Sequence, residues 1–150
     1  MISRLYGPPL SSGAPAPGFT LADDSGRTWS LDNLRGRWVI LVFYPGDSTP
    51  ICTRQLCSLR DDWEEFADLG VQVFGVNPRG KESHARFREK HRFPFPLLID
   101  AGARLAGAYR AGGWLVVRTV YIIGPDGIIR WARRGVPTTG EMLAVIEGRM

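Results

Sequence analysis

The pattern of apolar and polar positions along the chain predicts buried strands that alternate with amphipathic helices. Residues 38–44 are apolar on both sides of an extended chain, which is typical of a strand at the centre of a sheet. After a loop over residues 45–50, apolar side chains recur every three or four positions, which predicts one amphipathic helix ending at Gly70. Residues 71–76 predict a second buried strand, and residues 81–91 predict a second helix with Phe87 facing inward.

The segments on either side add two hairpins and two further helices. Residues 19–21 and 28–30 flank a turn at residues 24–26, and residues 119–123 and 128–132 flank a turn at residues 124–127. Residues 96–99 predict a short extended piece, residues 103–109 a short helix and residues 139–147 a final helix. This order predicts an α/β protein of thioredoxin-like fold, in which helices flank a mixed central sheet and an N-terminal β-hairpin precedes it. Residues 1–12 are expected to form a flexible tail, and residues 13–150 a single domain.

Composition narrows the class of protein. The chain has 150 residues, of which 44% are hydrophobic and 23% charged, which favours one folded domain over a disordered chain. Its longest apolar run, residues 38–45, is far shorter than the roughly 20 residues of a membrane span. The N-terminus lacks the apolar core of a secretory signal, so we expect a cytoplasmic protein. The net charge of +4 is spread along the chain and is weak evidence for a polyanion partner. The basic cluster around Trp131 could contact nucleic acid, but we interpret it as the solvated face of a strand, which has the same composition.

Cys52 and Cys57 are the two cysteines of the sequence. Cys52 follows Thr49 and Pro50, where Pro in a first helical turn predicts a helix N-terminus with unpaired backbone N–H groups. These groups and the helix dipole favour a thiolate, whereas an ordinary thiol is only about 3% ionised at pH 7. Full ionisation would need a guanidinium and direct hydrogen bonds in addition.

The spacing of the two cysteines argues against a structural staple. Five helical steps place their Cα atoms about 8.6 Å apart, whereas a disulfide needs them within about 7 Å. A bond between them would have to unwind the helix, which favours a transient disulfide. The alternatives to a reactive pair are that the two cysteines are ordinary buried residues or that they are metal ligands. His84 and His91, about 10 Å apart on one predicted helix, cannot share a metal ion within it, and both are interpreted as surface residues.

The segment YPGDSTPICTRQLCSLRD, residues 44–61, resembles the active-site segment of the peroxiredoxins, and in particular the bacterioferritin comigratory protein or peroxiredoxin Q subgroup of atypical 2-Cys type. Pro45, Thr49 and Cys52 keep the spacing of that family, and Cys57 stands where the subgroup has its resolving cysteine. The similarity continues through residues 31–36, 75–78, 95–100 and 118–127, nearly the whole chain.

The resemblance implies a thiol peroxidase. The Cys52 thiolate would attack a hydroperoxide and become a sulfenic acid, with Thr49 holding the peroxide, Arg118 contacting the sulfur and Pro45 shielding it from water. Cys57 would resolve the sulfenic acid as an intramolecular disulfide, which thioredoxin or a similar dithiol would reduce. The resemblance implies no metal, haem or flavin, and no nucleic-acid or membrane partner. A monomer is expected, with a weak homodimer as the alternative.

Three positions depart from the subgroup pattern, and the two cysteines are also compatible with two other functions. Gly46, Gln55 and Gly18 stand where the subgroup usually has Lys, an acidic residue and Asp, and the neutral amide of Gln55 changes the charge beside the cysteines. A thiol-disulfide oxidoreductase is one alternative, although the chain lacks the Cys-x-x-Cys motif of such enzymes. A redox sensor that passes its disulfide to a partner protein is the other.

Overall fold

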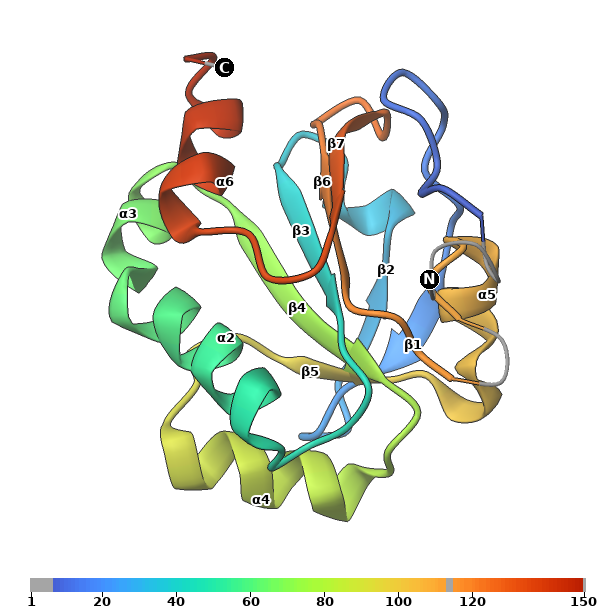
Figure 1. Ribbon diagram of the computed structural model, residues 1–150, viewed down its shortest axis with the longest axis vertical. Coiled ribbons are helices and arrows are strands. Elements are labelled where there is room, and N and C mark those ends of the chain that lie inside the picture. Colours follow the sequence, from blue (N-terminus) through green and yellow to red (C-terminus); the bar gives the residue numbers. More distant parts are fainter. Residues whose placement is uncertain (1–6, 113–114, 150) are drawn as a thin grey trace.

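A mixed sheet forms the centre of the molecule (Figure 1). The computed structural model describes residues 7–112 and 115–149, and for Cys52 it describes the backbone alone. Within these residues the main sheet has five strands in the order β5-β4-β3-β6-β7. They are β3 (Val39–Phe43), β4 (Gln72–Asn77), β5 (Leu97–Ile99), β6 (Thr119–Ile123) and β7 (Ile129–Arg134). β3, β4 and β5 run parallel, while β6 is antiparallel to both β3 and β7, as the predicted mixed sheet requires.

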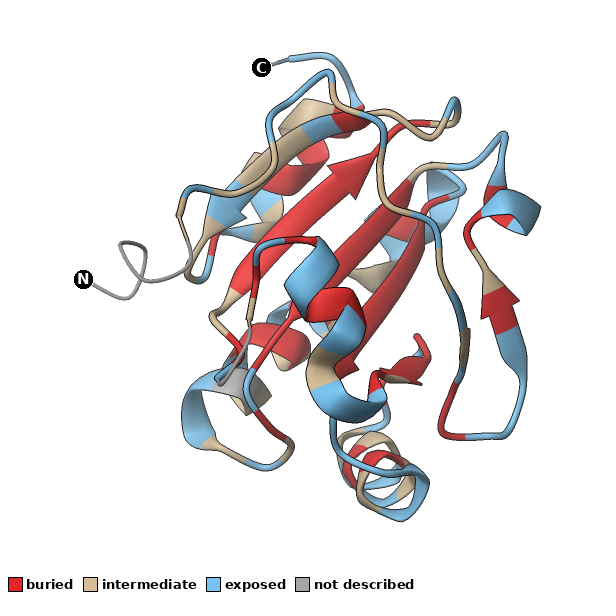
Figure 2. Cartoon of the chain, turned by 90° about the vertical axis from the view of Figure 1, so that its right-hand side faces the viewer, coloured by how far each residue is buried: buried red, intermediate tan, exposed pale blue. Residues whose placement is uncertain are grey.

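The sheet is buried on both faces because helices and loops cover each of them (Figure 2). Every residue of β3 is buried, which confirms the central strand predicted from residues 38–44. Ile40 and Val42 belong to the apolar cluster beneath α2 (Pro50–Asp61), α3 (Trp63–Asp68), α4 (Lys81–His91) and α6 (Thr139–Ile146). Leu41 and Phe43 belong to the cluster on the other face, beside α5 (Arg104–Ala108) and the short turns η1 (Asp32–Leu34) and η2 (Ala101–Ala103).

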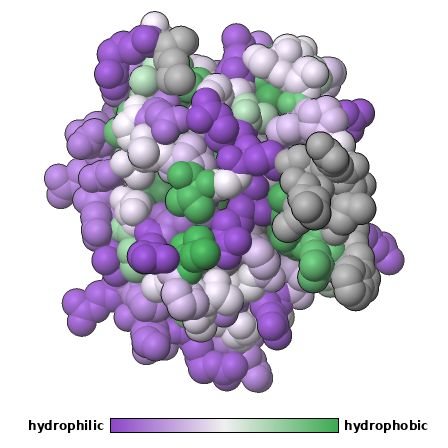
Figure 3. Space-filling model, viewed as in Figure 1, coloured by the Kyte–Doolittle hydropathy of each residue, from purple (hydrophilic) through white to green (hydrophobic). Residues whose placement is uncertain are grey.

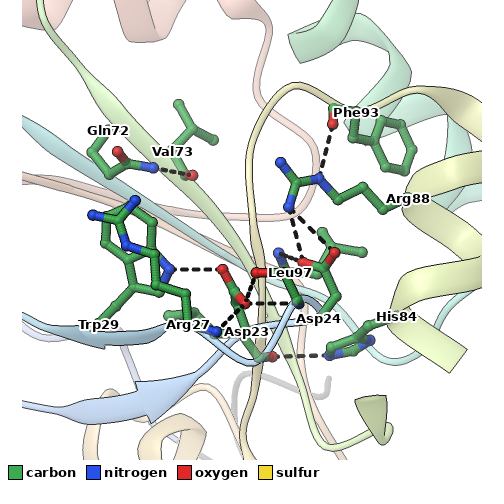
Figure 4. Close-up of polar contacts among 12 residues, drawn as sticks. Asp23, Asp24, Arg27, Trp29, Gln72, Val73, His84, Arg88, Phe93 and Leu97 are labelled. Carbon is green, nitrogen blue, oxygen red and sulfur yellow. Dashed lines mark hydrogen bonds and ion pairs between the residues drawn. The ribbon is translucent and has the colours of Figure 1, made fainter. Parts of the chain in front are cut away.

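The predicted N-terminal hairpin is present as β1 (Thr20–Ala22) paired with β2 (Thr28–Ser30). Asp23 closes its turn by accepting hydrogen bonds from the backbone N–H groups of Ser25 and Arg27 and from Trp29 Nε1 (Figure 4). Asp24 attaches the hairpin to the domain, because its carboxylate accepts from the Leu97 N–H at 3.1 Å and from Arg88 Nη1.

The prediction of a single helix ending at Gly70 is wrong, because the chain forms two helices, α2 and α3, that are separated by Asp62. Asp62 leaves the helical conformation, with φ −100° and ψ 15°. Its carboxylate accepts a hydrogen bond from the Thr139 hydroxyl at the start of α6, and Trp63 then packs against Phe95. No Gly or Pro marks this break in the sequence, so it follows from tertiary contacts.

The N-terminal segment up to residue 12 was expected to be a flexible tail. Residues 1–6 lie outside the described residues. Beyond them, the Leu10 N–H donates to the Tyr121 hydroxyl at 2.9 Å, and the Gly7 carbonyl accepts from Arg134 Nη2. In the part of the chain that is described, no helix combines the length and the apolar character needed to cross a membrane.

Candidate active site

Cys52 lies in the first turn of α2, as predicted. Thr49 is the N-cap residue and Pro50 is the first helical residue. The Thr53 N–H donates to the Thr49 carbonyl at 2.9 Å, so helical hydrogen bonding begins only after Cys52. The Cys52 backbone therefore lies at the positive end of the helix dipole, an environment that favours a thiolate.

Cys57 lies on the same continuous helix as Cys52. It is a free, half-buried thiol that packs against the apolar cluster under α2. Its Sγ atom is 4.0 Å from Nδ1 of His91, at the end of α4. Because helix geometry separates the two cysteine Cα atoms by about 8.6 Å, a disulfide between them requires α2 to unwind.

Two side chains near this helix end have buried polar atoms with no hydrogen-bond partner within the described residues. The Thr49 hydroxyl is one, and it makes no capping hydrogen bond to the helix. The Gln55 amide is the other, with both its oxygen and its nitrogen unpaired and the residue only 3% exposed. Buried polar groups in proteins are almost always hydrogen-bonded. The Thr49 hydroxyl and the Gln55 amide are therefore candidates to bind a ligand or water.

The remaining predicted site residues gather at the same end of the sheet. Pro45 is exposed and begins the loop that joins β3 to α2. Arg118 directly precedes β6, and the antiparallel register that pairs Phe43 with Thr119 brings it to the end of β3 where that loop begins. Its Nε atom is shielded from solvent. The predicted contact of Arg118 with the Cys52 sulfur involves a side chain outside the described residues.

A buried carboxylate, which sequence reasoning missed, anchors the loop between Pro45 and Thr49. Asp47 Oδ1 accepts hydrogen bonds from the Tyr44 hydroxyl at 2.8 Å and from Asn77 Nδ2 at 3.0 Å. Asp47 Oδ2 accepts from the Ser83 hydroxyl at 2.6 Å and lies 2.7 Å from Nδ1 of His84. The loop is thereby tied to β4 and α4.

Asp47 and His84 form a buried ion pair. Burial by itself would raise the pKa of the Asp47 carboxyl, but hydrogen bonds from His84 and Ser83 outweigh it and hold the pKa below its ordinary value. The other ring nitrogen of His84, Nε2, lies 2.9 Å from the Leu98 carbonyl oxygen. Both ring nitrogens of His84 therefore face oxygen atoms that only accept hydrogen bonds, the Asp47 carboxylate on one side and the Leu98 carbonyl on the other.

The interpretation of both histidines as surface residues is wrong. His84 is completely buried, and His91 is half-buried between aromatic rings. The signal was present in the sequence, because His84 and His91 stand three residues before and four residues after the inward Phe87 and so share its helix face. Across the described chain, no three His, Cys, Asp or Glu side chains gather closely enough to hold a metal ion.

The chain is similar in sequence to a known protein family and to named relatives. A sequence profile described as the AhpC/TSA family matches residues 12–132, most of the chain. The chain belongs to the AhpC/TSA family. Peroxiredoxin Bcp of Bacillus subtilis (strain 168) is 43% identical over 100 residues, which cover 67% of this chain and 64% of that protein. The chloroplastic peroxiredoxin Q of Oryza sativa subsp. japonica is 37% identical over 126 residues, which cover 81% of this chain. These names confirm the resemblance inferred from residues 44–61.

Solved structures confirm the thioredoxin-like fold of this chain. Peroxidoxin BcpB from Mycobacterium tuberculosis superposes with a TM-score of 0.86 at 29% identity, over 94% of this chain and 99% of that one. The bacterioferritin comigratory protein of Xanthomonas campestris superposes with a TM-score of 0.80 at 27% identity, over 87% of this chain and 91% of that one. The match spans only 58% of the length of the rice peroxiredoxin Q.

Proposed function

We propose that this chain is a thiol-dependent peroxidase in which Cys52 is the peroxidatic cysteine. The observation that carries the proposal is the position of Cys52 in the first turn of α2, three residues after Thr49, whose buried hydroxyl has no partner within the described residues. Such a hydroxyl is suited to hold a peroxide oxygen beside the thiolate. One of the similar structures is described by its alkyl peroxide reduction activity, which supports organic hydroperoxides as substrates. Hydrogen peroxide has the same O–O bond and is proposed as a second substrate.

In the first step, the Cys52 thiolate attacks the terminal oxygen of ROOH. The S–O bond forms as the O–O bond breaks, and the leaving RO⁻ takes a proton to become an alcohol or, from hydrogen peroxide, water. Sulfur is oxidised to the sulfenic acid and the peroxide is reduced. The location of Arg118 at the end of β3 supports a role in stabilising the thiolate and the charge that develops on the two oxygens. Pro45, at the start of the same loop, would limit the access of water.

In the second step, Cys57 condenses with the sulfenic acid to form a disulfide and water. Because α2 holds both cysteines on one helix, its first turns unwind for this step. Thioredoxin or a similar dithiol then reduces the disulfide by thiol exchange. The half-buried location of Cys57 in folded α2 supports this order, since the unwound segment exposes both sulfurs to the reductant.

The test is peroxide consumption coupled to thioredoxin, thioredoxin reductase and NADPH. Cys52→Ser is expected to abolish consumption, whereas Cys57→Ser retains one turnover per chain and loses recycling by thioredoxin. Consumption by Cys52→Ser at the wild-type rate would refute the peroxidatic role. Full thioredoxin-dependent turnover by Cys57→Ser would refute the resolving role, and stoichiometric oxidation of a partner protein without turnover would favour a redox sensor.

Thr49→Val isolates the contribution of the buried hydroxyl. Removing one preorganised donor from a reacting oxygen is expected to slow peroxide attack about 100-fold. Thr53→Val is the matched control on the same helix, and it should leave the rate within about twofold of wild type. Equal effects of the two substitutions would contradict the role of Thr49.

A further inference from the structure

His91 presents one ring nitrogen to the Cys57 thiol. Nδ1 lies 4.0 Å from Cys57 Sγ, which is within reach of a hydrogen bond to sulfur. The ring is held in place by two aromatic neighbours, Phe93 stacked at 5.5 Å and Phe87 edge-on at 5.2 Å. Arg60 Nη1 donates to the His91 carbonyl at 2.8 Å and so fixes the backbone at the end of α4 against α2. The two helices thus bring one thiol and one imidazole together.

The surroundings of His91 favour its neutral form. Partial burial lowers the pKa of His91 first, and the positive charges of Lys90 and Arg60 lower it further. Two titratable or charged groups of α2, Cys57 and Arg60, lie near the ring, and Arg54 lines the same surface hollow. The charged neighbour from α4 is Lys90. A neutral imidazole has one acceptor nitrogen, and with that nitrogen at Nδ1 it can take the proton of the thiol.

We propose that His91 is the general base that deprotonates Cys57 for disulfide formation. This inference rests on the proposed function, in which Cys57 resolves the Cys52 sulfenic acid. The thiol proton passes from Cys57 Sγ to His91 Nδ1 while α2 is still helical. When α2 unwinds, the Cys57 thiolate attacks the Cys52 sulfenic sulfur, so that the S–S bond forms and the S–O bond breaks. The departing hydroxide combines with the proton released by His91 to give water. Cys57 is oxidised, and the sulfenic sulfur is reduced.

The size of the effect follows from thiol ionisation. An ordinary thiol is about 3% ionised at pH 7, so a base can raise the reactive fraction by at most about 30-fold. Loss of the base is therefore expected to slow disulfide formation at pH 7 severalfold, and by at most about 30-fold. Above about pH 9 an ordinary thiol ionises without help, and the difference from wild type should disappear. A purely structural defect would persist at both pH values.

The experiment is a single turnover with one equivalent of hydrogen peroxide, quenched at intervals and analysed by mass for sulfenic acid and disulfide. His91→Phe keeps an aromatic ring between Phe87 and Phe93 but removes the nitrogen. His91→Gln is the second variant, which is polar but cannot act as a base. Glu89→Gln, an exposed change on the same helix, is the matched control and should follow wild type. Sulfenic acid formation at the wild-type rate shows that each variant is folded.

The expected result is a normal first step and a slow second step in His91→Phe and His91→Gln, with recovery at pH 9.5. Disulfide formation at the wild-type rate at pH 7, or an equal slowing at pH 7 and pH 9.5, would overturn the role of His91. Failure of the proposed function is recognised separately, because wild type would then form no Cys52–Cys57 disulfide at all.

Discussion

Replacing Asp47 by Asn tests the buried ion pair that anchors the loop carrying Thr49. Asn has nearly the same shape as Asp, but it removes the negative charge and turns one acceptor oxygen into a donor. That donor must face either the Ser83 hydroxyl and His84 or the Tyr44 hydroxyl and Asn77, all of which now donate to the carboxylate. The substitution therefore leaves the completely buried His84 without its carboxylate partner, and it makes one pair of donors face another donor.

The magnitude follows from the burial of both partners. The Asp47 side chain is 4% exposed and that of His84 is fully buried. Removing one partner of such a pair costs about 3–5 kcal/mol of unfolding free energy. With a urea m-value of about 2 kcal/mol/M, a loss of about 3 kcal/mol lowers the unfolding midpoint by about 1.5 M. For a chain of this length the melting temperature should fall by about 6–12 °C.

The assay is urea unfolding followed by tryptophan fluorescence and circular dichroism, with Asp126→Asn as the matched control. Asp126 pairs with Arg130 at 2.6 Å, but the side chains of that pair are 52% and 45% exposed. Such exposed pairs contribute at most about 1 kcal/mol. A midpoint shift for Asp47→Asn no larger than that for Asp126→Asn would refute the assignment of a charged, buried pair.

Four further outcomes are expected. Arg118→Ala slows peroxide attack by about 10- to 1000-fold, and a larger loss in Arg54→Ala, measured by stopped flow, would contradict that assignment. Gly75→Ala lowers stability by about 1–3 kcal/mol, since a Cβ there meets the Leu97 side chain at 2.7 Å, and thermal melts check it against Gly18→Ala, where nothing lies within 4 Å. Amides 51–59 exchange faster in the disulfide form than in the dithiol form, and equal protection by hydrogen exchange would argue against unwinding. The ionised Asp47 carboxylate stabilises the fold at pH values above its ordinary pKa, and this stability is lost as the pH falls through the lowered pKa that it has in the folded protein. In an acid titration, the unfolding free energies of wild type and Asp47→Asn should therefore begin to converge below about pH 4.

The sequence determined the elements and the spacing of the reactive segment. The strand over residues 38–44, the helix over residues 81–91 and both hairpins were predicted correctly, because the period of apolar positions is a local property that survives folding. The position of Cys52 in the first turn of a helix was equally local, since Thr49 and Pro50 mark the helix start. Arg118 was identified only through the resemblance, because it lies far from Cys52 along the chain.

Only the tertiary structure decided the polar partners. Asp47 and His84 are 37 positions apart, and Cys57 and His91 are 34 apart, so neither pair leaves a periodic signal. The break of the helix at Asp62 likewise depends on Thr139, which is 77 positions away. The physical reason is that an apolar side chain is satisfied by any apolar neighbour, so its pattern alone predicts burial. A buried polar group needs a particular partner at hydrogen-bond distance, and which elements meet at that point is settled only when the chain has folded.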